Sequence, residues 1–180
     1  MLRGSPRSEV ARERYWRPAQ VRLPALAQIA GVRVGYDTIQ YLEHCLGPGR
    51  KITGGHPHGG RIWEDRRSGL EIWADGFSSY AALKDQTYTG GRVIDRLSLS
   101  RSRNGTGNLF FMNRVRLGMT QAQVVRALTG ILPPPIVQKD TWTWKASGLS
   151  GDKQTFEYQA WTAELTFKAG ALDRITVQAD

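Results

Sequence analysis

The stretch VRVGY at residues 32–36 recurs as VRLGM at residues 115–119, 83 positions further along the chain. A second pair follows in the same order, because IDRLSL at residues 94–99 recurs as LDRITV at residues 172–177, at an offset of 78. Two matched stretches in the same order and at nearly the same spacing are typical of a duplicated structural unit. The sequence therefore predicts two copies of one module, each running from the start of a helix to a final strand.

Each copy is predicted to begin its helix with the same capping chemistry. Asp37 and Thr120 are good N-cap residues, and Gln40 and Gln123 stand three residues later, where a capping box places its glutamine. Both helices are expected to be about ten residues long, which is too short for stability in isolation. We therefore expect each helix to pack on a sheet.

Periodicity predicts antiparallel strands after each helix. Residues 161–168 alternate strictly between apolar and polar side chains, and Gly170 then predicts a tight hairpin. A short helix from Pro24 to Ala30 is also expected to precede the first module. Strands are expected at residues 61–65, 70–74, 92–99, 141–145, 154–168 (as one long or bent strand pair) and 171–179.

The predicted fold class is α+β, a tandem repeat of a helix-plus-antiparallel-sheet module. Residues 1–19 are expected to form a charged tail, residues 20–100 the first module and residues 109–180 the second. Residues 101–108, rich in Arg, Asn, Ser and Gly, are expected to be the linker.

The second copy carries a family resemblance. Its signature is VRLGMTQAQV at residues 115–124, WTW at 142–144 and LTF at 165–167, followed by Gly170. In these motifs, over about residues 113–177, it resembles the SmpA/OmlA (BamE) family of small modules of the bacterial envelope. Two such units in tandem are similar to the β-lactamase inhibitory protein fold, in which a concave sheet grips a partner. The resemblance implies a non-catalytic protein-binding function.

Composition limits the class of partner. The formal net charge of +9 favours an anionic partner, such as an acidic protein or an anionic lipid surface. The arginines are dispersed and no nucleic-acid-binding motif is present, so nucleic acid is not the expected partner. The single cysteine, Cys45, allows no intramolecular disulfide, and no apolar run is long enough for a transmembrane helix. The expected compartment is the bacterial periplasm or cell envelope if a signal peptide has been removed, and the cytoplasm otherwise.

The glycine-rich stretch at residues 54–60 contains the candidate metal ligands His56 and His58, with Glu64 or Asp65 as a third ligand. Proline and glycine in this stretch also suit a turn between a helix and a strand. The spacing matches no strong zinc signature, and no nucleophile–base or paired-carboxylate motif is recognisable. The sequence therefore predicts no enzyme, no catalytic residue, no cofactor and no metal.

Tryptophan and arginine are the residues that most often anchor protein interfaces. On one interpretation the sheet presents them to a partner, and at least two of the four strand tryptophans are then expected to be partly exposed near arginine side chains. On the other interpretation they fill the space between helix and sheet. The predicted partner-binding residues are Trp63, Trp73, Trp142, Trp144, Arg61, Arg66 and Tyr158.

The predicted function is that of a non-catalytic, inhibitor-like binding module with an aromatic and basic sheet face for an acidic protein. One alternative is a basic envelope assembly factor that associates with anionic lipid or with an outer-membrane assembly machine. The other alternative is a metal-dependent enzyme that uses the His56/His58 loop. A small-molecule substrate is not expected.

Overall fold

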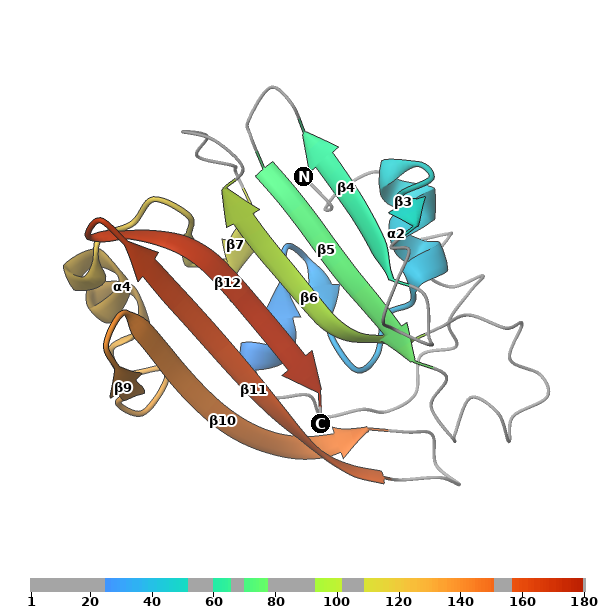
Figure 1. Cartoon of the computed structure of the whole chain (residues 1–180). Helices are drawn as coiled ribbons and strands as arrows, with labels where there is room; N and C mark the ends of the chain where they lie inside the picture. Colours follow the sequence, from blue (N-terminus) through green and yellow to red (C-terminus); the bar gives the residue numbers. More distant parts are fainter. Residues whose placement is uncertain are drawn as a thin grey trace.

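The computed structural model describes residues 25–51, 60–65, 70–77, 93–101, 109–150 and 157–179. Its main layer is an eight-stranded antiparallel sheet with the strand order β3-β4-β5-β6-β12-β11-β10-β9 (Figure 1). The strands of this sheet are β3 (Arg50–Lys51), β4 (Arg61–Asp65), β5 (Leu70–Phe77), β6 (Val93–Arg101), β9 (Ile136–Gln138), β10 (Thr141–Ser150), β11 (Glu157–Lys168) and β12 (Ala171–Ala179).

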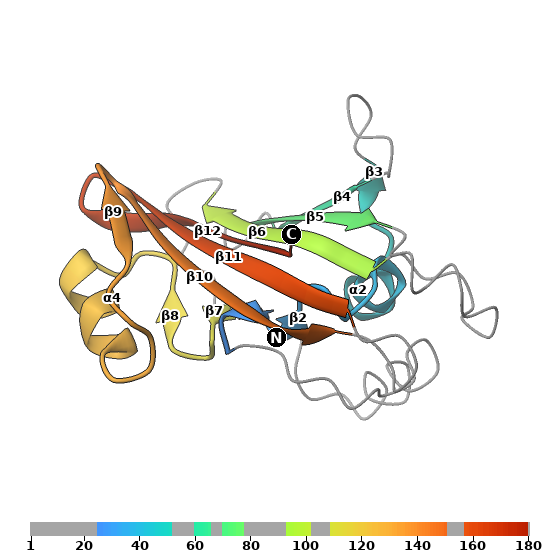
Figure 2. The same cartoon turned by 90° about the horizontal axis from the view of Figure 1, so that it is seen from below.

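A second layer covers one face of this sheet. It contains the 3-10 turn η1 (Ala25–Ala27), the helices α2 (Ile39–Leu46) and α4 (Gln121–Leu128), and a small four-stranded sheet. The small sheet has the order β2-β1-β7-β8, with β1 (Gln28–Ile29), β2 (Val32–Arg33), β7 (Phe110–Phe111) and β8 (Val115–Arg116). Figure 2 shows these elements on one side of the large sheet, and the described residues place no helix or strand on the other side. We call that other side the open face.

Strands of the N-terminal half occupy one half of the large sheet, and strands of the C-terminal half occupy the other. The two halves meet where β6 pairs with β12, in a register that places Ser98 opposite Thr176. We call this β6–β12 contact the seam. Both halves have the same element order, because two short strands precede one helix and four strands of the large sheet in each.

Matching backbone bonds also occur in the two halves. The N–H of Gly35 donates to the carbonyl of Ile94 at 2.7 Å, and the N–H of Gly118 donates to the carbonyl of Leu172 at 2.8 Å. Both glycines have positive φ, 80° and 86°, which glycine adopts without steric strain. Each bond ties the loop before the helix to the start of the last strand of the same half.

The helix caps follow the prediction in one half only. In α4, Thr120 Oγ1 accepts the N–H of Gln123, and the Gln123 side chain accepts the N–H of Thr120, as predicted. In α2 the N-cap is Thr38, not Asp37, and its hydroxyl accepts the N–H of Tyr41 at 3.2 Å. The prediction for Asp37 is wrong because its carboxylate is bonded elsewhere, to the backbone N–H and the guanidinium of Arg33 at 2.8 and 3.0 Å.

The hydrophobic core lies between the two layers and draws on both halves. Strand alternation explains its composition, since every second residue of a strand points to the same face. The fully buried side chains include Leu97 of β6, Trp161 of β11, Ile175 of β12, Leu42 of α2 and Phe111 of β7. The small sheet therefore contributes to the same core as the helices.

The strand predictions are confirmed at 61–65 and 171–179, and the hairpin between β11 and β12 turns at Ala169 and Gly170, both with positive φ. The helix expected from Pro24 to Ala30 is wrong, because only η1 forms before the chain enters β1. The four short strands of the small sheet were not expected, since two residues are too few to show a period. The predicted tail at 1–19, most of the linker at 101–108 and the loop with His56 and His58 lie outside the described residues.

Candidate functional site

Three of the four tryptophans predicted to bind a partner belong to the core. Trp63 on β4 is 9% exposed, while Trp142 and Trp144 on β10 are 8% and 4% exposed. The expectation that at least two of the four would be exposed is therefore wrong. Strand phase is the reason, because these residues share the face that α2 and α4 cover. The backbone register places Trp73 between Ile62 and Ser98, and its side chain lies outside the description.

The buried indoles hold the helix ends to the sheet. The indole N–H of Trp63 donates to the carbonyl of Gly47 after α2 at 2.8 Å, and that of Trp144 donates to the carbonyl of Pro133 after α4 at 2.9 Å. A Cβ at Gly49 would lie only 2.6 Å from the Trp63 ring, so the chain passes over this indole at a glycine. Both indoles thus have a structural role that exposure on a binding face would preclude.

Arg61 also has an internal role. Its Nε donates to Glu43 Oε1 of α2 at 2.8 Å, so the side chain ties β4 to the helix layer. Arg61 is therefore not the free cation beside an aromatic patch that the sequence predicted. The other two predicted site residues, Arg66 and the side chain of Tyr158, fall outside the described part of the chain.

The open face carries a different set of side chains, because alternation along β6, β11 and β12 sends the polar residues to this side. A hollow of about 540 Å³ lies over the seam. Its lining residues are Ile62, Arg96, Ser98, Ser100, Glu164, Arg174, Thr176 and Gln178. Seven of these eight are polar or charged, so the hollow is a polar surface centred on the seam.

Two arginines flank the centre of the hollow. Ser98 Oγ and Thr176 Oγ1 lie 2.9 Å apart across the seam, and Arg96 and Arg174 each stand two residues from this pair, on opposite strands. Arg96 lies opposite Gln178 and donates its Nε and Nη2 to Gln178 Oε1 at 3.1 and 2.6 Å. The seam therefore places two arginines that are 78 residues apart in the sequence on the same face, one on each side of the Ser98–Thr176 pair.

Arg174 differs from Arg96 because its cross-strand partner is the shorter Ser100. Its side chain is exposed and, within the described residues, makes no hydrogen bond or ion pair. Glu164, which stands opposite Thr176 on β11, is likewise exposed and without a partner in that part of the chain. Within the described residues, the hollow thus offers one cation and one anion without a partner, beside several hydroxyl and amide groups.

The lining includes groups that can bind an anion. A guanidinium group presents its donors in a planar fork that matches a carboxylate or phosphate group. Among the described residues, the lining contains one carboxylate and no histidine, cysteine or lysine.

Within the described residues, no three His, Cys, Asp or Glu side chains are grouped closely enough to hold a metal ion. No helix in the same residues is long and apolar enough to cross a membrane. Cys45 packs, half-buried, against the hydrophobic core.

Comparison of the chain with protein-family models, with curated proteins and with solved structures gives no significant match.

The sequence did hold a signal for Arg96 and Arg174, because both lie inside the recurring IDRLSL and LDRITV stretches. In each stretch the arginine alternates with apolar residues, which places it on the face opposite the core. These stretches indicate duplication as well, and the predicted binding residues were instead the tryptophans. Trp63, Trp142 and Trp144 lie on the face opposite these arginines.

Proposed function

We propose that the chain is a duplicated module of the SmpA/OmlA type, arranged as in the β-lactamase inhibitory protein, and that it acts as a non-catalytic protein-binding module. The binding surface is the open face, and the partner presents an acidic segment to the hollow over the seam. The duplication is supported by the shared element order of the two halves, the matched bonds at Gly35 and Gly118, and the strand order about the seam.

The observation that carries the binding proposal is Arg174. An exposed guanidinium group in the middle of a sheet face, without an internal partner in the described residues, is free to form a charge-assisted hydrogen bond with a carboxylate. The net charge of +9 increases the rate at which an acidic partner approaches. Glu164 and the hydroxyl groups of Ser98 and Thr176 provide the polar contacts that fix register.

The proposed binding surface is polar, whereas the surface expected from the sequence was aromatic, and this difference has an energetic reason. Three indoles buried in the core lower the free energy of the folded state without any partner. A polar face, in contrast, remains hydrated in the free protein and exchanges its water for a partner that matches its charges. Such a surface gives specificity through charge and hydrogen bonding.

The test uses the whole chain as bait in lysate of the native host, with mass spectrometry to identify captured proteins. Arg174→Glu is the perturbing variant. Arg116→Glu is the matched control, because Arg116 is also exposed but lies on β8 in the second layer, and the substitution gives the same change in net charge. A partner of the open face is lost with Arg174→Glu and kept with Arg116→Glu.

A second variant tests the same idea without changing charge. Ser100→Gln places a glutamine opposite Arg174, as Gln178 stands opposite Arg96. The new side-chain amide is therefore expected to accept hydrogen bonds from the Arg174 guanidinium group, as Gln178 does from Arg96. Titration of the recovered partner by calorimetry should give Kd values at least about tenfold higher for both Arg174→Glu and Ser100→Gln, a loss of about 1.4 kcal/mol. Equal affinity for the wild type and both variants would exclude the open face as the binding surface.

A further inference from the structure

Exposed apolar side chains concentrate at one end of the large sheet. Six large apolar side chains are exposed in the described residues, and four of them lie between residues 125 and 137. They are Val125 at 50%, Ile131 at 40%, Ile136 at 57% and Val137 at 56%. Figures 1 and 2 both show α4 and β9 at the same end of the molecule, so these side chains belong to one region of it. Clustered exposed apolar area commonly marks an interaction site.

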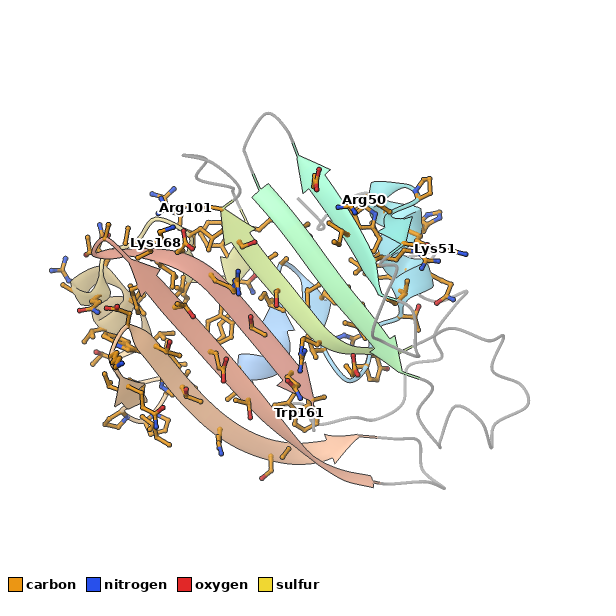
Figure 3. The ribbon with its side chains drawn as sticks, in the orientation of Figure 1. Arg50, Lys51, Arg101, Trp161 and Lys168 are labelled. Carbon is orange, nitrogen blue, oxygen red and sulfur yellow. The ribbon has the colours of Figure 1, made fainter. Side chains whose placement is uncertain are left out.

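Ile136 and Val137 belong to β9, which forms one edge of the large sheet. β9 is the last strand in the order, and within the described part of the chain no strand pairs with its outer side. The opposite edge is β3, which consists of the exposed residues Arg50 and Lys51 (Figure 3). Charged residues on an edge strand discourage pairing with another chain. β9 has Ile136 and Val137 where β3 has cations, so only one of the two edges is protected in this way.

Register shows which side chains an added strand would meet. Val137 stands opposite Trp142 and thus on the face that α4 covers, whereas Ile136 stands opposite Thr143 on the open face. An extended segment beside β9 would form main-chain hydrogen bonds with the strand. Its alternate side chains would then lie next to Val137, on the face of the sheet that faces the helix layer.

The local charge indicates the chemistry of the occupant. Between residues 121 and 140 the charged residues are Arg126, Lys139 and Asp140, which leaves the segment net positive within a chain of net charge +9. A second copy of this chain would place like charges against each other, whereas a segment with acidic flanks would not. We propose that the β9 edge binds an extended apolar segment of a protein partner, flanked by acidic residues, as an additional strand of the large sheet.

The experiment selects peptides from a displayed library of random 12-residue sequences on the full-length chain. We expect enrichment of peptides with alternating apolar residues and acidic residues at their ends. Val137→Lys should weaken their binding at least tenfold by fluorescence polarisation. Leu46→Lys is the matched control, because Leu46 is also an exposed apolar residue but lies on α2 in the other half, and it should leave binding within twofold.

Two further measurements distinguish strand addition from non-specific hydrophobic binding. N-methylation of alternate peptide amides removes main-chain donors and should abolish binding. If Val137→Lys fails to fold, Val137→Thr takes its place, because it keeps a β-branched strand residue and should also weaken binding. Failure to enrich such peptides, or equal binding to both lysine variants, would overturn the proposal. Dimers of the free chain in sedimentation that Val137→Lys dissociates would assign the edge to a second copy instead.

This inference is independent of the open face. Arg174→Glu lies on the seam and should leave peptide binding at β9 unchanged, so failure at one surface is distinguishable from failure at the other.

Discussion

Trp161→Phe should reveal whether the two halves of the chain unfold as one unit. Trp161 lies on β11 in the C-terminal half and is fully buried, and its indole N–H donates to the carbonyl of Val34 in the N-terminal half at 2.9 Å. Phenylalanine keeps an aromatic ring but removes this donor and the atoms of the second ring. Leaving a buried carbonyl without its donor costs about 1–3 kcal/mol, and the lost apolar contacts add about 1 kcal/mol.

The expected loss is therefore about 2–4 kcal/mol out of the roughly 5–15 kcal/mol typical of a domain. With a slope of about 2 kcal/mol per molar urea, the unfolding midpoint should fall by about 1–2 M. Urea unfolding followed by both tryptophan fluorescence and far-UV circular dichroism measures this loss and tests whether one transition is present.

Trp144→Phe is the matched control, because its indole bonds to Pro133 within the same half. If the halves form one cooperative unit, both variants shift a single transition by similar amounts. A change below about 0.5 kcal/mol in Trp161→Phe would refute the packing argument. Two transitions, of which only one moves, would show that the halves unfold separately.

Three other substitutions test local features by urea unfolding. Thr120→Ala removes the cap of α4 and should cost about 1 kcal/mol; Gln121→Ala, at an exposed first-turn position, is the control. Gly49→Ala places a Cβ 2.6 Å from the Trp63 ring and should cost about 1–3 kcal/mol, whereas an unchanged midpoint would mean that the loop moves freely away from the indole. Asp37→Ala removes the acceptor of two bonds from Arg33 and should cost about 2 kcal/mol, more than the loss of an ordinary cap.

The parts of the fold that were predictable from sequence are those governed by local signals. The capping box of α4 needs only Thr120 and Gln123, three residues apart, and the hairpin after β11 needs only Gly170 and strict alternation before it. Thr38 was missed as a cap because it is adjacent to Asp37, which has similar capping chemistry. Only the contact with Arg33 removes Asp37 from that role.

The binding face could not be assigned by the same means. Alternation shows that Trp142 and Trp144 share one face of β10 while Thr143 and Lys145 share the other, but it does not state which face a helix covers. That choice depends on the path of the chain after each helix, where the carbonyls of Gly47 and Pro133 accept the indole N–H groups. Sequence reasoning therefore identified the strands but not which of their faces the second layer covers.

The seam also shows how a duplicated surface can become asymmetric. In the proposed duplication Arg96 and Arg174 are equivalent residues, and so are Gln178 and Ser100, each of which stands opposite one of the arginines. A glutamine side chain extends far enough across the strand pair to accept from Arg96, as the bonds of 3.1 and 2.6 Å to Gln178 Oε1 demonstrate. A serine hydroxyl is about two bonds shorter, and Arg174 is left exposed without a bond to Ser100. One difference in side-chain length thus separates an arginine that joins the two halves from an arginine that is available to a partner.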